Sequence, residues 1–195
     1  MSQMLSPLTH YYMNLYIAQL INHFGQWTWL DAISYTISWW PFFTLLLVVI
    51  WLLWYRKSSR GEKQYLIALV IGIVLFYLIN ELTFKHLLTQ YIGVIARPYI
   101  AHPEFIHAIW AQFIDSSFPS SHMASSLVIL TLWIRRSPKR RLSSLIIALL
   151  VGFSRIHNGM HYPLDILAGA VFWVIYALVG IRASKLIIKK RPTIQ

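Results

Sequence analysis

The stretch PLDILAGAVFWVIYALVGI, residues 163–181, is apolar apart from one aspartate near its start. A helix of this length rises about 28 Å, close to the roughly 30 Å of a bilayer's hydrocarbon core. The segment therefore predicts a membrane-spanning helix. Its single carboxylate, Asp165, lies at the mouth of the span, directly after the polar stretch SRIHNGMHY at 154–162.

The composition also indicates an integral membrane protein. Of the 195 residues, 57% are hydrophobic and 12% are charged, whereas about a quarter of the residues in a soluble domain are charged. The length suits a single domain, residues 1–195. The chain has no cysteine, which excludes a disulfide framework and thiolate metal sites.

Four further apolar segments extend the prediction to a helix bundle. They lie at residues 33–55, 64–82, 119–134 and 142–153, and the last is short for a span. The N-terminal stretch YYMNLYIAQLINHFGQW is interrupted by Asn, Gln and His, which favours an interfacial amphipathic helix over an extra span. The predicted fold class is all-α, a polytopic transmembrane bundle of five to six helices.

The positive charges are concentrated between and after the apolar segments. The net charge is +11, and 14 of the 17 basic residues fall in three clusters, at 56–63, 135–141 and 182–191. Five spans place all three clusters on one side, which the positive-inside rule identifies as the cytoplasm. This distribution argues against a nucleic-acid partner. The other basic residues fall toward the opposite side and are Lys85, Arg97 and Arg155.

Two helix starts on that opposite side carry polar residues suited to an anion. In FPSSH, Pro119 favours the first turn of a helix, and the free N–H groups of that turn, with the hydroxyls of Ser120 and Ser121, can bind an anion. The plain alternative is an ordinary cap on a transmembrane helix. His122 completes this turn.

The segment HYPLD repeats the layout at the next outward-facing helix start. Asp165 follows His161 by four residues, so the two side chains share a helix face. Asp165 is then expected to accept a hydrogen bond from one imidazole nitrogen and leave the other as a nucleophile or base. The alternative is a His–Asp pair that only satisfies its own hydrogen bonds at the interface.

Arg97 and Arg155 carry planar guanidinium groups that suit paired phosphate oxygens. Each could instead extend toward lipid headgroups. His157 and Asp115 read first as polar loop residues. The histidines form no H-E-x-x-H pattern and no helix-face pair with a third ligand, so we expect neither a metal nor a cofactor.

These residues together resemble the type 2 phosphatidic acid phosphatase (PAP2) superfamily, whose motifs are K-x6-R-P, P-S-G-H and S-R-x5-H-x3-D. The likeness covers about residues 90–170. The third motif is complete, the second has Ser121 in place of Gly, and the first has Gln90 in place of Lys. The matching residues are Arg97, Pro98, Pro119, Ser120, His122, Ser154, Arg155, His161 and Asp165.

The resemblance implies a mechanism through a phosphohistidine. His161 would attack phosphorus with Asp165 orienting it, and His122 would protonate the leaving oxygen and then activate water. The phosphate oxygens would be held by Arg97, Arg155, Ser120 and the backbone of Ser121. The arginines neutralise the phosphate, so no metal is implied. Gln90 offers a hydrogen bond but no positive charge, which weakens phosphate binding in the first motif.

The expected function is that of a bacterial inner-membrane lipid phosphatase whose site opens on the periplasmic side, under the 83–118 connection. Its substrate would enter sideways from the bilayer. Undecaprenyl diphosphate is the first expectation, because the chain partly resembles short bacterial undecaprenyl-diphosphate phosphatases. The alternatives are a phosphatase for lipid A, phosphatidylglycerophosphate or phosphatidate, a lipid phosphotransferase, a pseudoenzyme, and a lipid-binding or transport protein.

Overall fold

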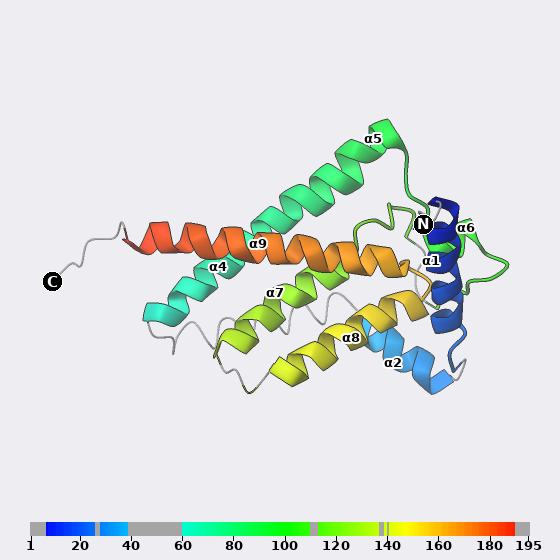
Figure 1. Cartoon of the computed structure of the whole chain (residues 1–195), viewed down its shortest axis with the longest axis horizontal. Helices are drawn as coiled ribbons and strands as arrows, with labels where there is room; N and C mark the ends of the chain where they lie inside the picture. The colour runs from blue at the N-terminus through cyan, green and yellow to red at the C-terminus, as the bar shows by residue number, and fades with distance from the viewer. Residues whose placement is uncertain are drawn as a thin grey trace, which may run out of the picture.

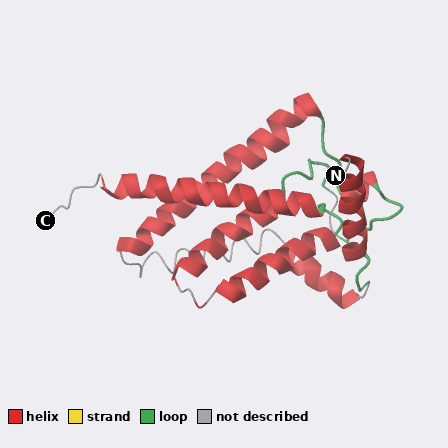
Figure 2. Cartoon of the chain, in the orientation of Figure 1, coloured by secondary structure: helices red, strands yellow, loops and turns green. Residues whose placement is uncertain are grey.

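The computed structural model describes residues 7–25, 28–38, 60–109, 113–136, 139 and 141–189. These residues form helices and connecting loops, with no strand among them (Figure 2). In chain order the helices are α1 (Pro7–Asn22), α2 (Thr28–Ser38), α4 (Arg60–Phe76), the π-helix η1 (Tyr77–Leu88), α5 (Thr89–Ile92), α6 (Pro98–Ala101), α7 (Ser121–Arg136), α8 (Arg141–His157) and α9 (Pro163–Lys189). The all-α prediction is confirmed for the described part of the chain.

Two of the described helices are long and apolar enough to cross a membrane. One is the continuous rod of α4, η1 and α5, over Lys63–Ile92, and the other is α9, over Pro163–Ile187. The spans expected at 64–82 and 163–181 fall within them. Helices α7 and α8, with 16 and 17 residues, are shorter. The span expected at 33–55 is described only in part. Residues 33–38 form the last part of α2, and residues 39–55 lie outside the described residues.

Helix α9 packs against α4 and α7, and α7 packs against α8 (Figure 1). The buried aromatic residues of α9, Trp173 and Tyr176, face α4 and α7. On another side of α9, Leu167, Val171 and Val174 are exposed. The exposed residues recur every three to four positions, which is the spacing of one helix face. A long exposed apolar face of this kind suits contact with lipid.

Helix α1 lies across the end of the bundle where α8 ends and α9 begins (Figure 1). The Asn14 side chain accepts a hydrogen bond from the N–H of Leu164 in the first turn of α9, at 3.1 Å. Buried Asn22 donates to the carbonyl oxygens of His107 and His157, at 2.9 and 2.6 Å, and accepts from the N–H of His107 at 2.9 Å. These contacts hold α1 across the bundle end, and its interfacial position in a membrane stays a prediction.

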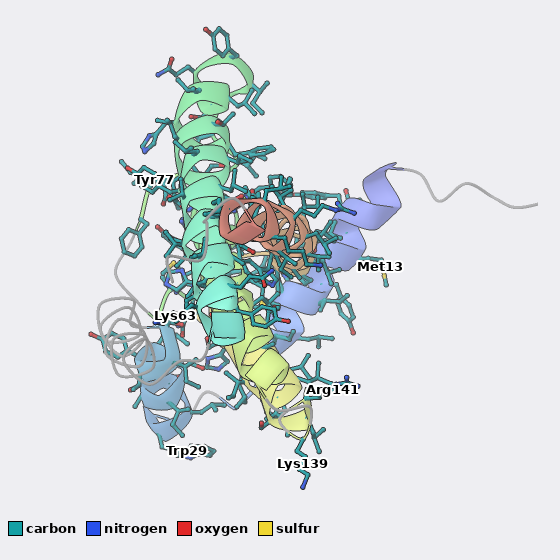
Figure 3. The ribbon with its side chains drawn as sticks, turned by 90° about the vertical axis from the view of Figure 1, so that its left-hand side faces the viewer. Met13, Trp29, Lys63, Tyr77, Lys139 and Arg141 are labelled. Atoms are coloured by element: carbon teal, nitrogen blue, oxygen red, sulfur yellow. The ribbon has the colours of Figure 1, made fainter. Side chains whose placement is uncertain are left out.

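The loops that carry the polar motifs and the basic helix ends lie at opposite ends of the molecule. The connections that lead into α6, α7 and α9 gather at the end covered by α1 (Figure 2). Lys63, Lys139 and Arg141 belong to the other end, which faces the viewer in Figure 3. The loop end therefore carries the polar motifs, as the charge distribution predicts.

Candidate active site

The starts of α7 and α9 are fixed against each other at the loop end of the bundle. The N–H of Ser120 donates to the carbonyl oxygen of Asp165 at 3.1 Å. Gly169, one turn further along α9, lies so close that a Cβ placed there would be 2.5 Å from the carbonyl oxygen of Ser120. The sequence motifs at 119–122 and 161–165 are thus held together by backbone contacts.

His161 lies in the loop between α8 and α9, with only 1% of its surface exposed. Its Nδ1 is 2.7 Å from the carbonyl oxygen of Ser117. A carbonyl oxygen can only accept a hydrogen bond, so Nδ1 must carry the proton. In the neutral ring Nε2 then keeps its lone pair, and His161 has the tautomer that a nucleophile requires.

The role expected for Asp165 differs from the observed contacts. Its Oδ2 is 3.8 Å from Nδ1 of His161, too far for a hydrogen bond, and accepts instead from the N–H of Tyr162 at 2.8 Å. The carboxylate therefore braces the loop and lies close enough to act on the histidine by its charge. The hydrogen bond that orients the ring comes from the backbone of Ser117, which no residue pattern reveals.

Burial, together with the surrounding charges, disfavours the protonated form of the His161 imidazole. Burial lowers its pKa well below the ordinary value, and Arg155, Arg97, Lys85 and His122 lower it further. These four residues come from α8, the α5–α6 connection, η1 and α7, so charges on four separate segments act on one histidine. At neutral pH this ring is an unprotonated base.

The two predicted arginines are buried at the site, with 3% of Arg97 and 2% of Arg155 exposed. The Nε atoms of both, and the hydroxyl of buried Ser120, find no hydrogen-bond partner among the described residues. Buried donors without an acceptor are costly and rare in folded proteins. Their gathering around His161 suits a ligand with several acceptor oxygens, and a phosphate group fits this description.

Arg97 is positioned by its neighbours in the loop. Its backbone is extended, as expected before proline, and Pro98 begins α6. Nη1 donates to the carbonyl oxygen of Met160 at 3.0 Å, and Nη2 donates to Oδ1 of Asp115 at 2.6 Å. The first contact ties the arginine to the residue before His161.

The structure adds three residues that the sequence motifs do not include: Lys85, Asp115 and Glu81. Lys85, on η1, donates to Oδ2 of Asp115 at 3.1 Å and lies 3.6 Å from Oε1 of Glu81. Glu81 in turn accepts a hydrogen bond from the hydroxyl of Ser121. Burial alone would raise the pKa of Asp115, but Lys85 and Arg97 outweigh it and hold that pKa below its usual value.

The other three predicted site residues, His122, Ser121 and Gln90, differ in burial and in distance from the site. His122 is half-buried in the first turn of α7, where its carbonyl accepts from the hydroxyl of Ser126 at 2.7 Å. Ser121 is buried beside Glu81. Gln90, by contrast, is exposed on the short α5, at the tip of the rod in Figure 1, and is not brought to the cluster. Among the described residues no three His, Asp or Glu side chains meet as metal ligands.

The sequence and the fold are similar to those of known phosphatases. Undecaprenyl-diphosphatase BcrC of Bacillus subtilis is 32% identical over 145 residues, covering 74% of this chain and 69% of that protein. A lipid A 1-phosphatase of Rhizobium johnstonii is 29% identical over 128 residues, covering 63% of this chain and 52% of that protein. The crystal structure of Aquifex aeolicus LpxE superposes with a TM-score of 0.62 at 24% identity, covering 87% of this chain and 95% of the other.

The family assignment rests on a match that includes the rod, the motif-bearing loops and α9. The model of the PAP2 superfamily matches residues 65–188, well over half of the chain. All three predicted motif regions fall within this range. The chain therefore belongs to the PAP2 superfamily of phosphatases.

Proposed function

We propose that the protein is a membrane lipid phosphatase that removes a phosphate group from a lipid phosphate or diphosphate through a phosphohistidine. The observation that carries the proposal is the environment of His161. Its proton is held on Nδ1 by the carbonyl oxygen of Ser117, its Nε2 keeps a lone pair, and buried guanidinium groups surround it. This combination supplies both a nucleophile and the charge that a phosphoryl group needs.

The reaction would proceed in two displacements. Nε2 of His161 attacks phosphorus, the bond from phosphorus to the leaving oxygen breaks, and His122, which takes up a proton when the anionic substrate binds, gives that proton to the leaving oxygen. In the second step neutral His122 takes a proton from water, the water oxygen attacks phosphorus, and the bond from nitrogen to phosphorus breaks. Inorganic phosphate leaves, and both histidines return to their starting states.

Arg97, Arg155, Ser120 and the start of α7 would bind the phosphate oxygens as charge develops on them. Because Arg155 and Arg97 already place positive charge in a buried site, the scheme needs no metal ion or other cofactor. The charge of Asp165, 3.8 Å from Nδ1, would stabilise the ring once phosphorylation makes it cationic.

Undecaprenyl diphosphate is the substrate that we put first, because the relative with that activity in its name matches 74% of this chain. Lipid A is the second candidate, since a lipid A 1-phosphatase also matches. The tail would stay in the bilayer, against the exposed apolar faces of α9, while the headgroup enters at the loop end. The basic helix ends at the other end support a site on the extracytoplasmic side of a bacterial inner membrane.

Phosphate release by the full-length protein in lipid vesicles tests the function. The substrates are undecaprenyl diphosphate, lipid A, phosphatidylglycerophosphate and phosphatidate, each with and without a chelator. We expect release that the chelator does not reduce and that His161→Ala abolishes, while His86→Ala, an exposed histidine on η1, leaves it unchanged. Lipid binding with no release from any substrate would instead support a binding or transport protein. Transfer of labelled phosphate to a second lipid would identify a phosphotransferase.

A further inference from the structure

One carboxylate joins two buried cations at the edge of the site. Oδ1 of Asp115 accepts from Nη2 of Arg97 at 2.6 Å, and Oδ2 accepts from Nζ of Lys85 at 3.1 Å. A carboxylate presents two oxygens a short distance apart, and so does a phosphate group. The two cations are therefore spaced to take two oxygens of one anion.

Lys85 is in a position where lysine is rarely found. Its side chain is 6% exposed, within a rod long and apolar enough to span a membrane. Lysine is almost never buried unless paired, and an ionisable residue inside a membrane segment usually marks a functional site. The carboxylates of Asp115 and Glu81 are the partners that compensate its burial.

The π-helical turn explains how Lys85 reaches the site. The buried residues of η1 are Asn80 and Lys85, five positions apart. At 3.6 residues per turn, five positions rotate the side chain by about 140°, whereas a π-helix closes its turn between residues five apart and keeps both on nearly one face. Asn80 accepts a hydrogen bond from the hydroxyl of Tyr176 on α9, at 2.5 Å. The inward face that carries Lys85 is thus anchored to α9.

Lys85 lies near His161, whereas Gln90 does not. The charge of Lys85 contributes to the lowered pKa of His161, so it lies within electrostatic reach of the nucleophile. Gln90, at the position that the family pattern gives to lysine, is exposed on α5. Lys85, five residues before Gln90 in the chain, therefore supplies near the site the positive charge that the first motif lacks.

We propose that Lys85 is the third cation that binds the substrate phosphate, and that Asp115 holds Lys85 and Arg97 at the spacing which the phosphate oxygens then take over. The proposal rests on the proposed phosphatase function. Asp115 is suited to withdraw, because its side chain is 38% exposed while those of Lys85 and Arg97 are 6% and 4% exposed. A phosphate dianion competes well with a single carboxylate for two cations.

Steady-state kinetics of phosphate release test the role of Lys85. Loss of one charged hydrogen bond predicts that Lys85→Gln raises KM about 10- to 100-fold, that Lys85→Arg keeps most of the affinity, and that Lys63→Gln, an exposed lysine on α4, changes nothing. If Lys85→Gln does not fold, the double variant Lys85→Gln/Asp115→Asn replaces the ion pair by two neutral amides. An unchanged KM in Lys85→Gln, or a raised KM in Gln90→Ala instead, would overturn the proposal.

Binding without turnover separates this proposal from the phosphatase function. In the His161→Ala background, inorganic phosphate is added and thermal unfolding is followed. We expect phosphate to raise Tm, Lys85→Gln to weaken the apparent phosphate affinity about tenfold or more, and Asp115→Asn to strengthen it. Weaker phosphate binding in Asp115→Asn would show a fixed anchor and contradict the displacement. Phosphate binding through Lys85 without any release by the wild type would reject the phosphatase function and leave the anion site standing.

Discussion

Gly169→Ala tests whether the close contact between α9 and the start of α7 sets the geometry of the reaction. A Cβ at this position would be 2.5 Å from the carbonyl oxygen of Ser120 and 3.3 Å from Cβ of Met123. Ordinary contact begins at 3.4 Å, so the helices must separate by about 0.9 Å at this point. The residues that would shift apart are the serine of the second motif and the loop that holds His161.

The expected cost follows from the size of that displacement. A misplacement of about 1 Å between reacting groups lowers the rate about 100-fold. We therefore expect kcat for phosphate release to fall about 100-fold, with a smaller change in KM, because the arginines lie on other segments. The assay uses full-length protein in vesicles, and thermal unfolding is measured alongside it.

Gly72→Ala provides the matched control. This glycine, on α4, also packs against α9, but its Cβ would meet the Trp173 ring at 3.4 Å, an ordinary contact. The control should keep its activity. If Gly169→Ala is as active as Gly72→Ala, the reasoning from this contact fails. If Gly169→Ala is inactive because it does not fold, Gly169→Ser must also fail to fold, since it adds the same Cβ.

Three further predictions follow from single contacts. Asp165→Asn keeps an acceptor for the N–H of Tyr162 but removes a charge 3.8 Å from Nδ1 of His161. At an effective dielectric constant of about 20 this charge is worth about 4 kcal/mol, so kcat should fall by up to about 1,000-fold, and a loss below tenfold would contradict the electrostatic role. Because the pKa of His161 is lowered in the folded protein, the unfolded chain binds a proton at this imidazole more readily than the folded one. The contribution of His161 to the free energy of unfolding is therefore complete above pH 6.5 and is lost as the pH falls below that value. His161→Gln should remove about 1.4 kcal/mol per pH unit of this dependence, and equal pH dependence of Tm in both proteins would refute it. Asn22→Ala leaves the N–H of His107 and two carbonyl oxygens without their partner, so unfolding in detergent should become easier by about 3 kcal/mol, whereas an unchanged Tm would show that α1 is not held there.

The sequence predicts the parts of this site that depend on local pattern. The apolar run of α9 and the spacing from Arg155 to Asp165 can be read directly from the sequence. The structure brings Arg97, Arg155 and His161 together, as the motifs imply. Proline before a helix start also marks where α7 and α9 begin to within two residues.

The sequence does not predict contacts that depend on tertiary structure. The atom that orients His161 is a backbone carbonyl oxygen 44 residues away, and any residue at position 117 could supply it. Lys85 lies twelve residues before Arg97, which does not fit the K-x6-R-P spacing, and that spacing says nothing about a π-helical turn that brings Lys85 inward. The same spacing points to Gln90, which is exposed on α5. The sequence marks Asp115 only as a polar loop residue, whereas the structure pairs it with two cations.

An assay for a covalent phosphohistidine on His161 tests the central claim. The full-length protein is mixed briefly with undecaprenyl diphosphate labelled in its terminal phosphate, quenched in alkali, where phosphohistidine survives, and digested for peptide mapping. We expect the label on the peptide that contains His161, absent in His161→Ala and retained in His86→Ala. Rapid phosphate release with no label on any histidine would contradict nucleophilic attack by this residue.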